Sequence, residues 1–227
     1  MKVFYANDPD SKQFEEILFW FHKYMDGSVS SKMEQNGLHY QVNNGVSVVH
    51  LRRFASQLEC SPQLIMRLWH SNIREGMILA TLLFDETILT TESDLIKEKL
   101  TNNEMSEQFA FNLGYKAPQI CHYYMSWLAN SNEDIQIAAI LSVSVALQRK
   151  VDLNSDDLIL FLNAVVDLDI RSHSFERSIT RMFVGMLSNV EIRGLISNLI
   201  QKWEVDQNLA KRRIANEVAV ELQYLNN

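Results

Sequence analysis

The sequence has few of the residues that interrupt helices, and it has no long apolar run. Its 227 residues include only 7 glycines and 3 prolines, too few turn-forming residues for an all-β protein of this size. No apolar run approaches the roughly 20 residues that a membrane-spanning helix needs, so we expect no membrane partner. Because 47% of the residues are hydrophobic, the chain can nevertheless bury a sizeable core.

Cysteine is also scarce and shows no metal-binding spacing. Cys60 and Cys121 lie far apart in the sequence, and we expect both to be buried free thiols in a reducing cytoplasm. The histidines form no H-x-x-x-H pair and there is no glycine-rich phosphate loop, so we expect neither a metal ion nor a cofactor. The segment 1–8 lacks the long uncharged apolar stretch of a signal peptide, which also favours a cytoplasmic location.

Charge is distributed unevenly along the chain. The total is −7, but the segment 85–170 holds 5 basic and 14 acidic residues, whereas the segment 171–227 holds 8 basic and 6 acidic residues. A DNA-binding groove needs cations along its length, because phosphate neutralisation and counterion release supply most of its non-specific affinity. The acidic middle therefore suits a basic partner, and the C-terminal part suits DNA.

Apolar residues recur at the period of an α-helix in most segments. The expected helices are about 10 to 16 residues long with short connections, which indicates antiparallel helix pairs. We therefore predict an all-α protein, a solenoid of about five or six helix pairs that forms a single domain over residues 1–227; a globular bundle is the alternative. The clearest stripes are Ile135, Ala138, Ala139, Ser142, Val145 and Ala146; Phe175, Ile179, Met182, Phe183, Met186 and Leu187; Leu195, Ile196, Leu199, Ile200 and Trp203; and Ile214, Val218, Leu222 and Leu225.

Capping residues predict where several helices begin. Thr91, Asn132 and Ser155 each precede carboxylates that suit the first turn of a helix, where the helix dipole favours negative charge. The Asn-Asn-Gly sequence at 43–45 indicates a tight turn before a helix that begins near Val48.

Two segments resemble the signatures of a known family. The segment 45–55, which begins Gly-Val and continues to Leu-Arg-Arg-Phe-Ala, resembles the first motif of the AlkD-like DNA alkylation repair proteins. The segment 68–80, a Leu-Trp pair followed by Glu75 and an apolar helix, resembles the next motif. The similarity is strongest over residues 25–83, and the lead-in at 25–45 resembles that of a bacterial branch of the family. On these motifs the chain is identified as a divergent member of that family.

The resemblance implies a superhelix of HEAT-like repeats with a concave groove, which in active members binds duplex DNA and excises N-alkylated bases. A carboxylate and flanking tryptophans stabilise the positive charge that develops on the sugar, and an arginine holds backbone phosphate. In this chain Asn103 replaces the tryptophan and Glu107 the aspartate of the Trp-x-x-x-Asp element. The arginine position falls near Ile137 and a second tryptophan position near Arg181. Glu107 is thus the candidate catalytic residue.

Several side chains have both a functional and a structural interpretation. Glu104 and Glu107 share a helix face and form either an acid–base pair or a solvated acidic surface. Arg177 and Arg181 also share a face, beside Arg171, and either bind nucleic acid or cover an exposed helix. Large aromatic side chains among the stripes are expected to be buried core residues. These are Trp20, Trp69, Trp127 and Trp203.

Two functions follow from these observations. The first is an AlkD-like DNA alkylation repair protein that binds duplex DNA, with weak or no N-alkylpurine DNA glycosylase activity because the groove residues are replaced. The second is a non-enzymatic HEAT-repeat scaffold that binds a protein or peptide partner, which the acidic middle favours. A base-release assay on duplex that contains a methylated purine distinguishes the catalytic form of the first hypothesis from the second.

Overall fold

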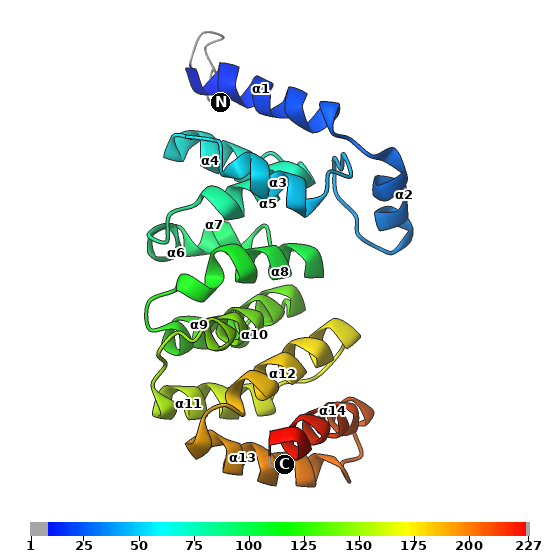
Figure 1. The fold of residues 1–227 in the computed structure, drawn as a ribbon, viewed down its shortest axis with the longest axis vertical. Helices are drawn as coiled ribbons and strands as arrows, with labels where there is room; N and C mark the ends of the chain where they lie inside the picture. Colours follow the sequence, from blue (N-terminus) through cyan, green and yellow to red (C-terminus); the bar gives the residue numbers. More distant parts are fainter. Residues whose placement is uncertain (1–8, 226–227) are drawn as a thin grey trace. The chain divides into compact units, whose positions relative to one another are not determined.

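The computed structural model describes residues 9–225, and these are helical almost throughout (Figure 1). The segment 1–8, on which the prediction about a signal peptide depends, lies outside the described residues. Within the described range there is no β-strand, and an isolated parallel bridge joins Val42 to Ile73. The predicted all-α fold is therefore confirmed. None of the helices in this range is long and apolar enough to cross a membrane.

Two compact units divide the chain, and helix α8 (Asn103–Asn112) runs across their boundary. One unit ends at Gln108 and the other begins at Phe109. The single domain over residues 1–227 stays a prediction. Described helices of the first unit are α1 (Pro9–Lys23), α2 (Gly27–Gln35), α3 (Val48–Ala55), α4 (Pro62–Trp69), α5 (Arg74–Leu83), α6 (Ile88–Thr91) and α7 (Ser93–Lys97). Those of the second are the 3-10 helix η1 (Gly114–Lys116), α9 (Ile120–Leu128), α10 (Glu133–Gln148), α11 (Ser155–Val166), α12 (His173–Met186), α13 (Val190–Trp203) and α14 (Leu209–Leu225).

Side-chain caps fix where several helices begin, with two shifts from the predicted positions. Asn132 caps α10 as predicted, because its side chain accepts an amide hydrogen bond from the first turn. Helix α11 is capped one residue earlier than expected, by Asn154 instead of Ser155. Thr91 ends α6 and does not begin a helix, so that prediction is wrong. Its hydroxyl donates to the carbonyl of Thr87, a bond that a threonine inside a helix can make.

In the first unit α4 packs against α5, and α1 and α3 flank this pair. Trp69 at the end of α4 is fully buried, and its indole N–H donates to the carbonyl of Leu95 at 3.1 Å. The loop before α3 turns at Gly45, which has φ +72°. A Cβ atom at Gly45 would overlap the carbonyl oxygen of Asp26, so only glycine fits this close approach.

The second unit is built around α10, which packs against η1, α9 and α12. All its residues from Ile135 to Ala146 are buried, and not only the predicted stripe, because neighbouring helices cover α10 on several sides. Small side chains allow η1 to lie close to α10. A Cβ atom at Gly114 would overlap the Ser142 hydroxyl, and the Tyr124 hydroxyl donates to the Gly114 carbonyl at 2.9 Å.

Candidate nucleic-acid interface

The two arginines predicted to bind nucleic acid lie on α12, in the second unit. Arg177 is exposed, and Arg181 is half-buried with its guanidinium carbon 5.9 Å from the centre of the Phe111 ring. At the end of α10, the Arg149 guanidinium carbon lies 3.9 Å from the centre of the Tyr115 ring. Its Nη2 also donates to the Phe111 carbonyl at 2.9 Å. We call these five residues the α10–α12 basic face.

This face presents cations whose positions are partly fixed before any ligand binds. A cation over an aromatic ring gains about 0.5–1 kcal/mol at an exposed site, and the negative end of the α10 dipole also favours Arg149. A guanidinium has five N–H donors and suits the geometry of phosphate. Because Arg149 gives one donor to a carbonyl, it keeps others for an anion. The arrangement can therefore bind a phosphodiester backbone.

The third arginine of the predicted patch, Arg171, has a different surrounding. Its guanidinium donates to the Gln136 side chain at 3.0 Å and to the Ser131 carbonyl at 3.4 Å. It also lies 3.5 Å from the Glu133 carboxylate. These bonds tie the segment before α12 to the start of α10, so we assign Arg171 a structural role.

The position expected for a phosphate-binding arginine is part of the core. Ile137 is only 1% exposed. The adjacent Gln136 is buried as well, and its amide nitrogen donates to the carbonyls of Leu128 and Asn130 at 2.8 Å each. An arginine at Ile137 would have to place its charge among apolar side chains, which explains why the apolar residue suits this fold.

The candidate catalytic residue, Glu107, accepts a long hydrogen bond of 3.4 Å from the Asn103 side chain. Both residues are half-buried on α8. Three of the tryptophans belong to the hydrophobic core, as predicted. Trp69, Trp127 and Trp203 are 0%, 1% and 4% exposed. Trp20 differs from that prediction, because it is half-buried and lies in a cluster of rings near the surface. A catalytic role for Glu107 stays a prediction.

Glu104 does not belong to a solvated acidic surface, so that expectation is wrong. Its side chain is 14% exposed and binds the guanidinium of Arg74 through both oxygens, at 2.8 Å and 2.5 Å. The Tyr40 hydroxyl donates to the same carboxylate at 2.6 Å. An acid–base pair with Glu107 is also excluded for this geometry, because the Glu104 oxygens are already bonded within the first unit.

The two segments that carry the family resemblance meet at this ion cluster. Glu75 of the second motif is fully buried and accepts hydrogen bonds from the Asn44 amide and side chain at 3.1 Å each. It also accepts from the Val46 amide at 3.2 Å, beside Gly45 of the first motif. Arg74 in turn donates to the Val46 carbonyl at 2.9 Å. These motif residues therefore fix the loop before α3.

Burial and charge act in opposite directions within the cluster. Burial on its own would lower the pKa of Arg74, but the hydrogen bond and the charge of Glu104 outweigh it, and the pKa is raised overall. The pKa of Tyr40 is raised well above its ordinary value, first by burial and then by the neighbouring Glu104 charge. Arg74 thus stays charged and Tyr40 neutral, and neither is a proton donor or acceptor for catalysis near neutral pH.

Metal-binding and thiol chemistry have little support in the part of the chain that the structure describes. Within residues 9–225, no three His, Cys, Asp or Glu side chains are grouped so that they could hold a metal ion. Cys60 and Cys121 are both free thiols, half-buried and buried respectively. Burial raises the pKa of Cys121 to about 12, with a further contribution from Asp157, so this thiol is not a nucleophile.

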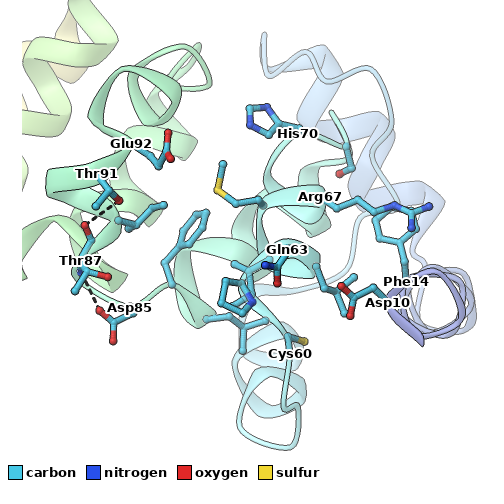
Figure 2. A pocket seen from close by; sticks show the side chains of 18 residues that line it. Asp10, Phe14, Cys60, Gln63, Arg67, His70, Asp85, Thr87, Thr91 and Glu92 are labelled. Atoms are coloured by element: carbon cyan, nitrogen blue, oxygen red, sulfur yellow. Dashed lines mark hydrogen bonds between the residues drawn. The ribbon is translucent and has the colours of Figure 1, made fainter. Parts of the chain in front are cut away.

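A hollow of about 990 Å³ lies in the first unit, beside α4 (Figure 2). Its apolar lining includes Met66, Phe84 and Ile88. Figure 2 shows Glu92 and His70 on opposite sides of the opening, with Asp85 near Thr87. The cation among the lining residues, Arg67, is turned toward Phe14, with its guanidinium carbon 4.1 Å from that ring's centre. Three carboxylates, those of Asp10, Asp85 and Glu92, line the hollow.

Sequence patterns indicated Arg177 and Arg181 but missed the rest of the basic face. Arg149 closes a helix at a Gln-Arg-Lys sequence, and a basic residue at a helix end was a usable signal. Phe111 and Tyr115 carried no such signal. They precede Arg181 by 70 and 66 residues, and only the packing of η1 and α12 on α10 brings them near the arginines.

Comparison with known proteins supports the fold. No family model matches the chain, and no curated protein matches it either. A solved structure is similar with a TM-score of 0.68 and 14% sequence identity, over 91% of this chain and 94% of the other. That structure is described as a new family of proteins related to the HEAT-like repeat DNA glycosylases with affinity for branched DNA structures. The chain therefore has the HEAT-like helical-repeat fold that its sequence motifs predicted.

Proposed function

We propose that this chain is a DNA-binding protein of the repair type, with the α10–α12 basic face as its contact to the phosphate backbone. The observation that carries the proposal is the pair of arginine–ring contacts, Arg149 on Tyr115 and Arg181 on Phe111. The structurally similar protein's affinity for branched DNA supports the choice of ligand. A fold shared with such a protein does not by itself give this chain the same activity, so the cations on the face carry the argument.

Base excision is not part of the proposed function. The three positions that would form the excision site hold Asn103, Ile137 and Arg181, and none supplies the expected group. The remaining carboxylate, Glu107, has an asparagine as its hydrogen-bond partner. Excision of a cationic base needs an electron-rich pocket and an oriented carboxylate. We expect no release of base from duplex DNA that contains a methylated purine.

Binding assays over a range of salt concentrations test the proposal. Fluorescence anisotropy with labelled duplex and branched DNA gives the dependence of affinity on salt. The slope of log K against log salt is negative, and each lost phosphate contact reduces its magnitude by about 0.9. We expect the double variant Arg149→Gln/Arg181→Gln to reduce this magnitude by about 2. Lys202→Gln, an exposed residue on α13 outside the face, is the matched control and should leave the slope unchanged. Salt-insensitive binding, or no binding, would overturn the proposal.

A second candidate function is favoured by the hollow beside α4. Apolar side chains and carboxylates among its lining residues suit a basic peptide that also carries apolar residues. Titration of a synthetic Lys/Leu-rich peptide tests this function by calorimetry. Glu92→Lys should weaken binding, and Glu34→Lys on α2, away from the hollow, should not. A pull-down that recovers nucleic acid and no protein would count against the peptide function.

A further inference from the structure

Four rings gather between α1 and α3 in the first unit. The Trp20 and Phe54 rings are stacked, with centres 4.0 Å apart and planes 2° from parallel. Tyr24 lies 4.5 Å from Trp20 and 5.8 Å from the His50 ring. Tyr24 directly follows α1, and its amide still bonds to the Trp20 carbonyl at 3.2 Å, one turn earlier. These two rings therefore face two rings of α3, and the chain runs antiparallel to α3 here. We call these residues the α1–α3 ring cluster.

Each helix adds a cation to the same stripe. Lys23 lies three residues after Trp20 and directly before Tyr24. In the same way, Arg53 lies three residues after His50 and directly before Phe54. Residues at i, i+3 and i+4 share one helix face, so both cations lie beside the rings. The Lys23 nitrogen is 5.6 Å from the centre of the Tyr24 ring, and Arg53 is exposed. The segment 35–58 contains no Asp or Glu, which leaves the α3 side of the cluster with positive charge.

The ring cluster is open to solvent, unlike the other aromatic stacks that contain tryptophan. Tyr24 is 42% exposed and Trp20 is half-buried, whereas Trp69, Trp127 and Trp203 are at most 4% exposed. An exposed aromatic face next to cations is the combination that binds single-stranded nucleic acid. The base stacks on the ring and the cation neutralises the phosphate that follows it.

We propose that the α1–α3 ring cluster binds unpaired nucleotides of DNA, with a base stacked at Tyr24 and a phosphate held between Lys23 and Arg53. The choice of DNA rests on the proposed function, but the surface is separate from the α10–α12 basic face. Bases inside a duplex are already stacked, so this surface selects overhangs and forks, where bases are free. Stacking on a ring is tolerant of base identity, so little sequence preference is expected.

Paired DNA substrates test the inference. Anisotropy is measured with a blunt duplex and with the same duplex that carries an oligo-dT overhang. Loss of one stacked base reduces affinity about 5-fold to 100-fold, so Tyr24→Leu should weaken overhang binding by that factor and leave the blunt duplex unaffected. Lys23→Gln and Arg53→Gln should each weaken overhang binding less and reduce its salt dependence. Tyr224→Leu, another exposed tyrosine at 75%, is the matched control.

Tryptophan emission gives a second readout that does not depend on affinity. Because Trp20 touches Tyr24 and the other indoles are buried, oligo-dT should change the emission of the wild type and not that of Trp20→Phe. If Tyr24→Leu binds the overhang normally while Arg149→Gln/Arg181→Gln weakens all DNA, the inference is wrong and the proposed function stands. If the wild type binds neither substrate, both fail. A change of Trp20 emission with an acidic peptide but not with oligo-dT would assign the cluster to a protein partner and overturn the inference.

Discussion

The two units place their charges differently. In the first unit, Arg74 and Glu75 are 1% and 0% exposed and form a hydrogen-bonded cluster with Glu104. In the second unit the core around α10 is mostly apolar, and an ion pair joins Arg213, 54% exposed, to Glu176 on α12, whose side chain is 10% exposed. A pair with both partners buried that loses one of them leaves a charge without solvent or counter-charge, whereas a pair with one partner at the surface stays partly hydrated. The motif residues Arg74 and Glu75 thus stabilise the first unit from within, whereas Arg213 of the second unit's pair is largely in solvent.

The largest expected effect is from removal of the buried cation. Arg74→Met leaves the carboxylates of Glu75 and Glu104 uncompensated, and we expect a loss of about 3–5 kcal/mol in the free energy of unfolding. Urea denaturation measures it, and hydrogen exchange should show lost protection over residues 38–46. Arg213→Met is the control in the second unit, with a much smaller loss. Equal losses in the two variants would remove the contrast between the units.

The second unit should be sensitive to added volume instead of lost charge. A methyl group at Gly114 would overlap the Ser142 hydroxyl and lie 2.7 Å from the Phe109 ring. We expect Gly114→Ala to destabilise the protein by about 1–3 kcal/mol, the usual effect of overpacking. Thermal unfolding followed by circular dichroism measures it. An unchanged Tm would show that the packing around η1 yields more easily than the structure indicates.

A second glycine of the same unit should respond in the opposite direction. Gly194 lies inside α13, and a Cβ atom there would meet nothing within 4 Å. Because glycine is a poor helix former, Gly194→Ala should stabilise the protein by about 0.5–1 kcal/mol. This variant is also the control for Gly114→Ala, since both changes add one methyl group. Destabilisation would mean that this face of α13 has a partner in solution.

The smallest effect is a pH-dependent one at the Arg213–Glu176 pair. The hydrogen bond from Arg213 chiefly lowers the pKa of Glu176 below the ordinary glutamate range. A lowered folded-state pKa contributes stability above the unfolded-state pKa, and that stability is lost as the pH falls through the folded-state value. Glu176→Gln should therefore lower Tm by about 1–2 °C at pH 7, and the difference should shrink as the pH falls below the ordinary glutamate range. Glu191→Gln on α13 is the control. A difference that persists at low pH would contradict the ion-pair explanation.

The repeating helices could be predicted from the sequence, because burial repeats every three or four residues within one helix. The stripe at 175–187 lies on α12, and Asn132 caps α10 as expected, whereas on α10 the predicted stripe is part of a segment that is buried throughout. Boundaries were less accurate. Thr91 was assigned to the start of a helix because its hydroxyl suits a cap, but that hydroxyl instead bonds back within α6.

Partners that are distant in the sequence could not be predicted in the same way. Glu104 was interpreted with Glu107, its neighbour on the helix, but its partner is Arg74, 30 residues earlier. Arg181 was predicted to share a helix face with Arg177, but it is half-buried beside the Phe111 ring, which has no periodic relation to α12. Trp20 was assigned to the core because it lies in an apolar stripe, but α3 covers one side of that stripe and leaves Tyr24 exposed. Local periodicity does not determine these contacts, which depend on how helices pack.

The glycine turn before α3 has a consequence for finding distant kin of this chain. At Gly45 the backbone conformation and the nearby Asp26 carbonyl admit no side chain, and Glu75, thirty residues later, binds the amides on both sides of it. A protein that shares this architecture must solve the same steric and hydrogen-bonding problem whatever it binds. A fingerprint of a glycine and a buried glutamate at this separation would therefore collect proteins by their scaffold, whatever ligand each of them binds.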